Sequence, residues 1–453
     1  MAAVKYRSRM NSSDAIIWHI ERDPLLQSTI MAVWELDAEP TPQRMRESAV
    51  RMMLSIDRLH QRVEPARPRP RWVEVDDIDV DDHFSTHHLG GDASMADALA
   101  FAETWVRQPF DRTRPLWRLG LLTGLAGGRA AVVIKVHHAI ADGIGLVLML
   151  AAFTDLEPNP TQRFEPDHPP TDDERPRWSS ARRWAHRARI AVRTVRSGPV
   201  AATREAATTL RSMTKVVWPH RTPHSRLMTE RSTQLHLDHR AIPLRALKEA
   251  GRAAGVSLND TFVALVADAV GRYHDHHHVT CDRLRVHMPV NVRNSRTANL
   301  AGNQFVPARI SLQVPTRNHA GGLGWVSDQI EQLRAEPGLP HINAVSAAVH
   351  RTGVAMTRWI IGGMMKGVDV LASNVPGPNF PLYLAGARVE HFVAYGPPAG
   401  AALNVTLFSY RSTVYLGITT DAAAIPDRER FLACVDASIA HLIGDHDHVP
   451  VGV

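Results

Sequence analysis

The segment His137–Gly143, HHAIADG, lies between two apolar runs and constrains the fold around it more than any other feature of the chain. The run Ala130–Val136 before it is rich in β-branched residues, which predicts a buried strand. The run Ile144–Phe153 after it is rich in Leu, Met and Ala, which predicts a helix. A strand that passes through a short polar loop into a helix predicts a mixed α/β fold with polar side chains held at the end of a strand.

The two adjacent histidines are expected to have different environments. Neighbouring residues on a strand point to opposite faces, so one imidazole can enter a cleft while the other packs inside. The unperturbed pKa of imidazole, about 6.5, suits a general base at neutral pH. Two other interpretations stay open on the motif alone: a structural pair of histidines, and a metal site that includes Asp142. The metal site is disfavoured because His137 and His138 would point apart.

Asp142 follows the turn and is expected to anchor the loop. Such a carboxylate needs a cation as its partner. Arg293, at the end of another predicted strand, is the candidate for this structural role.

Several further segments accompany the histidine motif in a characteristic order. They are SSDAIIWHIE (Ser12–Glu21), Pro115-Leu116-Trp117, Asn259-Asp260 and SNVPGP (Ser373–Pro378). Together with HHAIADG, which is similar to an HHxxxDG motif, they resemble the bacterial wax ester synthase/acyl-CoA:diacylglycerol acyltransferases across nearly the whole chain. This family shares the HHxxxDG motif with chloramphenicol acetyltransferase-like enzymes and with peptide-synthetase condensation domains.

The resemblance implies a fold and an activity. The fold is two chloramphenicol acetyltransferase-like domains, each a mixed sheet with flanking helices, with an active-site tunnel at their interface. The activity is direct transfer of a fatty acyl group from acyl-CoA to a long-chain alcohol or a diacylglycerol, without cofactor or metal. A carrier-protein-bound donor and a non-catalytic lipid-droplet protein remain as alternatives. No G-x-S-x-G segment occurs, so no covalent acyl-enzyme is expected.

The resemblance also implies roles for individual residues. His138 is the general base, His137 belongs to the same catalytic motif, and Asp142 mainly organises the loop. Asn259 is placed at the site, where an amide near a helix N-terminus can help stabilise an oxyanion. The residues expected to bind substrate or to line the tunnel are Gly143, Pro115, Leu116, Trp117, Asn374 and Pro376. A purely structural role for the PLW and SNVPGP segments stays open, with Trp117 in the core near the site.

The surroundings of Asn259 predict a helix start. A helix over Pro243–Ala254 should end at Gly255, and Ser257 then has the features of an N-cap with Asp260 three residues later. On these local grounds alone, Asn259 is equally well explained as an ordinary first-turn residue. The apolar stripe of the new helix consists of Phe262, Leu265, Val266 and Ala269.

Charge is distributed unevenly along the chain. Between Arg175 and Arg226 there are thirteen Lys and Arg residues and one acidic residue, a local net charge of +12, whereas the whole chain carries +6. Tryptophans and aliphatic residues alternate with these arginines over Trp178–Trp218. This pattern is typical of solvated crossover helices or of an amphipathic surface that docks on anionic membranes or lipid droplets. Nucleic-acid binding is disfavoured because no recognised module accompanies the charge.

Length and composition predict the domain organisation and the compartment. We expect an N-terminal domain over residues 1–165, a basic helical linker over 166–230 and a C-terminal domain over 231–453. The two cysteines form no spaced motif, and neither a signal peptide nor a membrane-spanning run is expected. These features favour a cytoplasmic protein that associates peripherally with a membrane or a lipid droplet.

The remaining patterns predict individual elements. Tyr273–His278, YHDHHH, is expected to form an exposed loop with at most incidental metal affinity. Strands are expected at Thr29–Leu36, Leu284–Arg293, Arg309–Val314, Asn404–Tyr410 and Thr413–Thr420, and further helices at Thr41–Leu54 and Pro426–Ile443.

Overall fold

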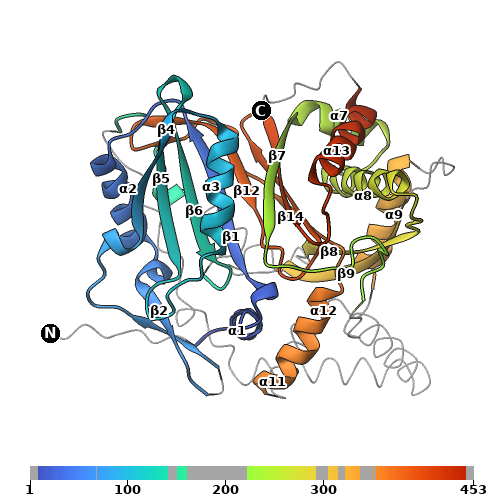
Figure 1. Cartoon of the computed structure of the whole chain (residues 1–453), viewed down its shortest axis with the longest axis horizontal. Helices are drawn as coiled ribbons and strands as arrows, with labels where there is room; N and C mark the ends of the chain where they lie inside the picture. The colour runs from blue at the N-terminus through green and yellow to red at the C-terminus, as the bar shows by residue number, and fades with distance from the viewer. Residues whose placement is uncertain are drawn as a thin grey trace, which may run out of the picture.

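Two six-stranded mixed sheets form the frame of the protein and lie beside one another, with helices packed against each (Figure 1). The computed structural model describes residues 9–67, 69–140, 149, 151–160, 222–291, 305–314, 322–336, 349 and 353–444. This architecture confirms the predicted mixture of sheets and flanking helices.

The N-terminal sheet has the strand order β11-β12-β1-β6-β5-β4. Strands β4 and β5 run parallel, and the other neighbours are antiparallel. The bounds are β1 Thr29–Leu36, β4 Phe84–Ala93, β5 Trp117–Leu125, β6 Arg129–His137, β11 Tyr383–Leu384 and β12 Ala387–Tyr395, with helices α2 Pro42–Ser55 and α3 Met95–Arg107 against the sheet.

Strand β1 lies in the middle of this sheet, between β12 and β6. All eight of its residues are buried, which explains why it has apolar residues on both faces instead of a polar-apolar alternation. The predicted strands at Thr29–Leu36 and Ala130–Val136 are confirmed, and β6 continues through His137.

The C-terminal sheet has the order β7-β14-β13-β10-β8-β9, in which β10 runs parallel to both of its neighbours. The strands predicted at Asn404–Tyr410 and Thr413–Thr420 are confirmed, and they pair as an antiparallel hairpin. The bounds are β7 Leu235–Pro243, β8 Arg283–Asn291, β9 Phe305–Gln313, β10 Val370–Val375, β13 Leu403–Tyr410 and β14 Thr413–Asp421, with helices α7 Leu244–Ala253, α8 Leu258–His276, α9 Gly322–Arg334 and α13 Arg428–Ile443.

The C-terminal part of the chain contributes strands to the N-terminal sheet. Strands β11 and β12 belong to the range expected to form the C-terminal domain, yet they complete the N-terminal sheet. One apolar cluster contains residues of β1 and β6 together with Leu237 and Tyr415 of the other sheet, so the core is continuous between the sheets. The predicted boundaries at residues 165 and 230 remain predictions, since residues 161–221 lie outside the described part of the chain.

A group of short helices lies below the two large sheets in Figure 1. Helix α1, Ser12–Ile20, contacts one helical segment that consists of α11 Val354–Thr357, the π-helical turn η6 Arg358–Gly362 and α12 Gly363–Lys366. The remaining elements are the small sheet of β2 Gln61–Glu64 and β3 Arg71–Glu74, and the short turns η1 Pro24–Leu26, η2 Asp57–His60, η3 Val80–Asp82 and η4 Ala126–Gly128.

The histidine-rich segment Tyr273–His278 is not the exposed loop that we predicted. Helix α8 continues to His276, and both Tyr273 and His274 are fully buried. The ring of His274 hydrogen-bonds through Nε2 to Ser225 Oγ at 2.8 Å. The prediction was wrong because the apolar stripe of α8 extends into this segment and prolongs the helix.

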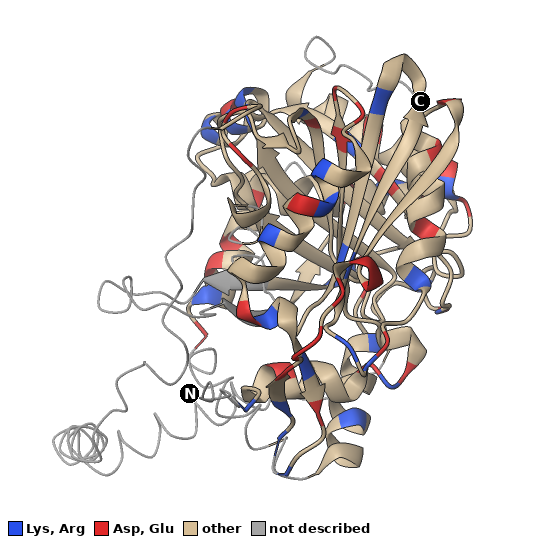
Figure 2. Cartoon of the chain, turned by 90° about the vertical axis from the view of Figure 1, so that its left-hand side faces the viewer, with Lys and Arg blue, Asp and Glu red and all other residues tan. Residues whose placement is uncertain are grey.

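Among the residues that the structure describes, no single helix is long and apolar enough to cross a membrane. Helices α7 and α8 reach that length and hydropathy only together, across a bend of 94°. Basic and acidic residues are interspersed along the elements drawn in Figure 2. The strongly basic range Arg175–Arg226 lies almost wholly outside the described residues.

Candidate active site

The two histidines lie where β6 ends, and backbone hydrogen bonds fix the position of both. The N–H of His137 donates to Leu116 O at 2.9 Å, and the N–H of His138 donates to Ser28 O at 2.8 Å. The side chain of His137 is buried with 1% exposure, whereas His138 is half-buried. The predicted difference between the two environments is confirmed.

The ring of His137 has a hydrogen-bond partner at each nitrogen. Its Nδ1 accepts from the backbone N–H of Ala139 at 3.0 Å, and its Nε2 lies 2.7 Å from Oε2 of Glu21. A backbone N–H can only donate, so Nδ1 presents its lone pair and the ring proton lies on Nε2, from which it is donated to the carboxylate. His137 therefore fixes the backbone of the residues on either side of His138.

Glu21 supplies the carboxylate that accepts the hydrogen bond from His137. Its other oxygen, Oε1, accepts from the backbone N–H of Ser28 at 3.1 Å, and Arg112 donates to Oε2 at 3.1 Å. Burial alone would raise the pKa of Glu21, but the hydrogen bond from His137 and the charge of Arg112 hold it below its ordinary value. The carboxylate is thus ionised at neutral pH.

The ring of Trp18 packs against both side-chain partners of Glu21. Trp18 meets the ring of His137 edge-on with 5.7 Å between centroids, and the Arg112 guanidinium lies 4.1 Å above the Trp18 ring. Sequence reasoning assigned no role to Glu21 or Arg112. The available signal was an acidic residue that directly follows the apolar helix of the SSDAIIWHIE segment.

Lys135, two residues before His137, shares its face of β6 and is also buried. Its ammonium donates to the carbonyls of Trp105 and Gln108, both at 2.8 Å, and lies 4.8 Å from the centroid of the Trp105 ring. Burial, with a smaller contribution from the charge of Arg118, lowers the pKa of Lys135 to about 7. This side chain ties the end of α3 to the strand that carries the histidines.

The PLW segment packs beside the same strand. Pro115, Leu116 and Trp117 are buried, and the carbonyl of Leu116 receives the N–H of His137. Trp117 donates from Nε1 to the carbonyl of Leu59 at 2.8 Å. Packing of Trp117 in the core near the site is confirmed, and substrate binding by this segment stays a prediction.

The SNVPGP segment leaves the end of β10. Asn374 is half-buried on the strand, and Pro376 is exposed just beyond it. Gly377 passes so close to β13 that a Cβ there would overlap the carbonyl oxygen of Ser409 and the ring of Phe408. Within the described part of the chain, no hydrogen bond joins these residues to His138, and their binding role stays a prediction.

Asn259 lies in the first turn of α8, as predicted. The capping box is confirmed: Ser257 Oγ accepts from the N–H of Asp260 at 3.2 Å, and the carboxylate of Asp260 accepts from the N–H of Ser257. Helix α8 packs against α7, α9 and α13, and no hydrogen bond between described residues joins Asn259 to His138. Its role as an oxyanion donor stays a prediction.

Three predicted site residues, Asp142, Gly143 and Arg293, lie outside the described residues, so the pairing of Asp142 with Arg293 stays a prediction.

Among the described residues, no group of three or more His, Cys, Asp or Glu side chains could hold a metal ion. Both cysteines are buried free thiols, and burial raises the pKa of Cys281 to about 12.

Comparison with known proteins identifies relatives over almost the full length. The family model of the wax ester synthase/diacylglycerol acyltransferase catalytic domain matches residues 10–262, and that of the C-terminal domain of the same family matches residues 301–442. A putative diacylglycerol O-acyltransferase of Mycobacterium tuberculosis H37Rv is 32% identical over 451 residues, which cover 95% of this chain and 90% of the relative. A probable diacylglycerol O-acyltransferase of the same strain, tgs2, is 26% identical over 83% of this chain and 84% of its own.

Solved structures share the fold. The wax ester synthase/diacylglycerol acyltransferase from Marinobacter aquaeolei VT8 matches with a TM-score of 0.66 and 19% identity, over 96% of this chain and 98% of its own. The first condensation domain of the CDA synthetase matches with a TM-score of 0.64 and 16% identity, over 99% and 98% of the two chains. Both likenesses confirm the predicted architecture.

Proposed function

The chain belongs to the wax ester synthase/diacylglycerol acyltransferase family and is an acyltransferase, and from this premise we propose that His138 is its general base. The proposal is supported by the hydrogen bonds of the neighbouring ring, that of His137. His137 uses Nδ1 to accept from Ala139 and Nε2 to donate to Glu21, so neither nitrogen can take a proton from a substrate without losing a partner. The half-buried His138 is the remaining imidazole of the motif.

The reaction is an acyl transfer in one displacement through a tetrahedral intermediate. His138 removes the proton of the acceptor hydroxyl as its oxygen attacks the thioester carbonyl of acyl-CoA, which forms the C–O bond. The negative charge on the carbonyl oxygen is stabilised by nearby donors, among which we include Asn259. The C–S bond then breaks, and the imidazolium returns the proton to the thiolate of coenzyme A. No acyl-enzyme forms and no further cofactor takes part.

Other residues order the loop after His138 or line the substrate tunnel. We propose that Asp142 orders the loop after His138 with Arg293 as its partner. The substrate tunnel would be lined by Gly143 and by the PLW and SNVPGP segments, with Asn374 and Pro376 on the side of the C-terminal sheet.

Diacylglycerol is the acceptor that we favour, because the names of the mycobacterial relatives specify diacylglycerol O-acyltransferases. Long-chain alcohol is the second acceptor of this family. Both are lipids, so we propose that the protein is cytoplasmic and docks peripherally on anionic membranes or lipid droplets through the basic segment Arg175–Arg226. Sedimentation with anionic liposomes at rising salt tests the docking: binding at low salt supports it, and its absence there contradicts it.

A carrier-protein-bound acyl donor is the second candidate, because condensation domains of peptide synthetases share the fold. A single assay compares palmitoyl-CoA with a palmitoyl carrier protein, each with a diacylglycerol and a long-chain alcohol in parallel. Faster turnover of palmitoyl-CoA supports the proposed function. Turnover of the carrier-bound donor alone would favour the second candidate, and turnover of neither would indicate a non-catalytic lipid-binding protein.

A further inference from the structure

Helix α3 lies between the N-terminal sheet and β7, the strand that ends the order of the C-terminal sheet (Figure 1). A strand in this position has N–H and C=O groups that point away from its neighbour and need other partners. At Leu237 of β7, side chains supply these partners. The carboxylate of Glu103, from α3, accepts the Leu237 N–H at 2.8 Å, and Arg428 donates to the Leu237 carbonyl at 3.1 Å. Helix α3 is therefore joined to the backbone of the C-terminal sheet.

Further polar contacts strengthen this junction. The guanidinium of Arg428 lies 3.5 Å from Glu103 Oε1 and bonds both oxygens of Asp238 at 2.9 Å. Arg107, one turn after Glu103 on α3, donates to the side-chain oxygen of Gln234. Only 16% of the Glu103 side chain is exposed, so its charged contacts are screened less by salt than surface pairs are. Two side chains of α3 thus hold the chain at the start of β7.

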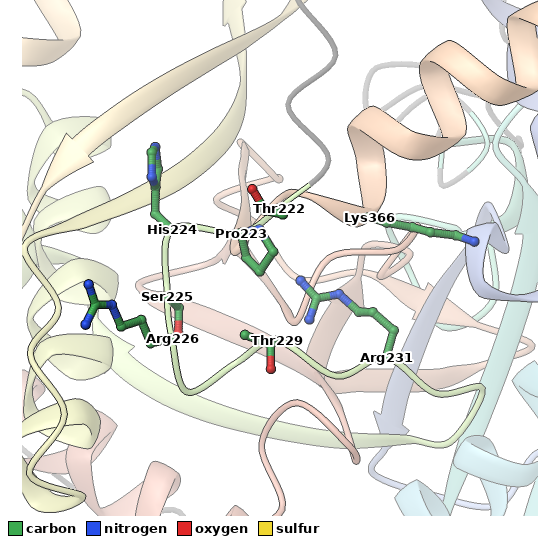
Figure 3. A pocket seen from close by; sticks show the side chains of 8 residues that line it. All are labelled: Thr222, Pro223, His224, Ser225, Arg226, Thr229, Arg231 and Lys366. Atoms are coloured by element: carbon green, nitrogen blue, oxygen red, sulfur yellow. The ribbon is translucent and has the colours of Figure 1, made fainter.

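Strand β7 is in turn fixed to the rest of the C-terminal half. The chain enters β7 from a strap, residues 222–231, which Figure 3 shows beside a cavity of about 690 Å³. Asp369, with 0% exposure, accepts the backbone N–H groups of His224 and Ser225 at 3.0 and 3.1 Å. Arg231 donates to four main-chain carbonyls. Because the strap is held at several points, the contact of Glu103 joins α3 to the C-terminal sheet as a whole.

The last turn of α3 is bonded to the N-terminal half. The last carbonyls of a helix lack the partners that carbonyls in its middle have. Lys135 of β6 donates to two of these carbonyls, those of Trp105 and Gln108, both at 2.8 Å. Gln27 donates from Nε2 to a third, that of Arg107, at 3.2 Å. The end of α3 is thus fixed by one side chain from β6 and by one from the segment before β1.

Lys135 and Gln27 adjoin the residues that fix the two histidines. Lys135 lies two residues before His137 on β6. Gln27 directly precedes Ser28, whose carbonyl accepts the N–H of His138 at 2.8 Å. A shift of the end of α3 would therefore act on both strands that hold His138. Helix α3 is one rigid element between the C-terminal sheet and the turn that presents this histidine.

We propose that Glu103 is a positioning residue for the acyl transfer. It holds α3, and through α3 the turn of His138, in a fixed place relative to the C-terminal sheet. The inference rests on the proposed function for the role of His138 as the base. It assigns to Glu103 no contact with either substrate, so loss of the carboxylate lowers kcat more than it raises KM.

Steady-state kinetics with palmitoyl-CoA and a diacylglycerol test the proposal. Glu103→Ala leaves the Leu237 N–H without its acceptor, and we expect kcat to fall about tenfold while KM for palmitoyl-CoA stays near its wild-type value. Glu103→Gln keeps an acceptor oxygen and should recover most of kcat. Glu103→Asp keeps the charge but is one methylene shorter, so it should also lower kcat, and it replaces Glu103→Ala if that variant does not fold.

Asp436→Ala is the matched control. Asp436 of α13 bonds Arg240 of the same strand, β7, at 2.9 Å, and both residues belong to the C-terminal half. This variant removes a carboxylate from β7 but leaves the bond between α3 and β7 in place, so kcat should match wild type. Equal losses of kcat in Asp436→Ala and Glu103→Ala would show a general loss of stability and would overturn the proposal. Wild-type kcat in folded Glu103→Ala would overturn it as well.

Hydrogen exchange provides a readout that does not depend on turnover. The N–H of His138 is donated to the carbonyl of Ser28, so its exchange rate reports how firmly the turn is held. We expect a peptide that contains His138 to exchange about fivefold faster in Glu103→Ala, as for the net loss of one hydrogen bond, and at the wild-type rate in Asp436→Ala. This result supports the link through α3 even if no acyl transfer is found, which separates it from the proposed function. Unchanged exchange in Glu103→Ala contradicts the link.

Discussion

Nε2 of His137 lies 2.7 Å from Oε2 of Glu21, so the histidine that precedes the proposed base is tied to a residue 116 positions earlier in the chain. Arg112 and the backbone N–H of Ser28 bond to the same carboxylate. Ser28 in turn receives the N–H of His138 through its carbonyl. The carboxylate therefore holds both sides of the turn that presents His138, and we interpret Glu21 as a positioning residue.

Replacement of Glu21 should affect the positioning of His138, which kcat reports, and leave substrate binding almost unchanged. Glu21→Ala leaves the buried N–H of His137 without an acceptor, which should lower the free energy of unfolding by about 2 kcal/mol. Misplacement of His138 should lower kcat on the order of tenfold to hundredfold, with little change in KM. Steady-state kinetics and urea unfolding measure both effects.

Two variants control this experiment. Glu21→Gln keeps an acceptor oxygen for His137 and should recover most of kcat. Glu47→Ala removes an exposed carboxylate of α2 and should resemble wild type. A kcat in Glu21→Ala equal to that of wild type would show that the carboxylate does not position the site.

The depressed pKa of Glu21 predicts how stability changes in acid. Its hydrogen bond with His137 and the charge of Arg112 outweigh burial, so its folded-state pKa lies below that of the unfolded chain, about 4.3. The stabilisation is fully present above the unfolded pKa and is lost as the pH falls through the folded pKa. Urea unfolding between pH 6 and pH 3 should show a steeper loss of stability in wild type than in Glu21→Gln. Equal loss of stability with falling pH in the two proteins would contradict an ionised Glu21 carboxylate in the folded state.

The pKa of Lys135, about 7, predicts a second rise of stability with pH, in a higher pH range. The unfolded chain keeps this proton up to a pKa of about 10.4, whereas the folded protein releases it near pH 7. Folding therefore becomes more favourable between pH 7 and pH 10, by at most about 1.4 kcal/mol per pH unit. Lys135→Met removes the titrating group at similar volume and should remove this rise. A rise of the same slope in the variant would assign it to another group.

The turn after β10 should not tolerate a side chain at Gly377. A Cβ there would overlap backbone of β13, so Gly377→Ala should destabilise the protein by about 2 kcal/mol or more. Gly91→Ala is the control, because a Cβ at Gly91 meets no atom within 4 Å. Thermal unfolding of the two variants measures the difference, and equal melting temperatures would contradict the close approach.

Local patterns predicted local structure well. Strand β1 has the bounds that its apolar run predicted, and the capping box of Ser257 and Asp260 forms because its two members are three residues apart. The opposite environments of His137 and His138 follow from strand geometry alone.

Long-range partners could not be predicted in this way. Nothing in the sequence near His137 indicates that Glu21 receives its proton, because the contact depends on how α1 packs below β6. The return of β12 to pair with β1 also depends on the tertiary fold. The histidine-rich end of α8 was wrongly predicted to be an exposed loop. Its polar composition gave no indication that the buried face of the helix continues through His274.

The most direct test of the account compares His138→Ala with His137→Ala and wild type in an assay with palmitoyl-CoA and a diacylglycerol, with circular dichroism as a measure of folding. Loss of a general base lowers turnover by about 10² to 10⁴-fold. The account predicts that His138→Ala stays folded and loses turnover to this extent, while His137→Ala retains more activity. Turnover in folded His138→Ala equal to that of wild type would contradict the assignment of the base.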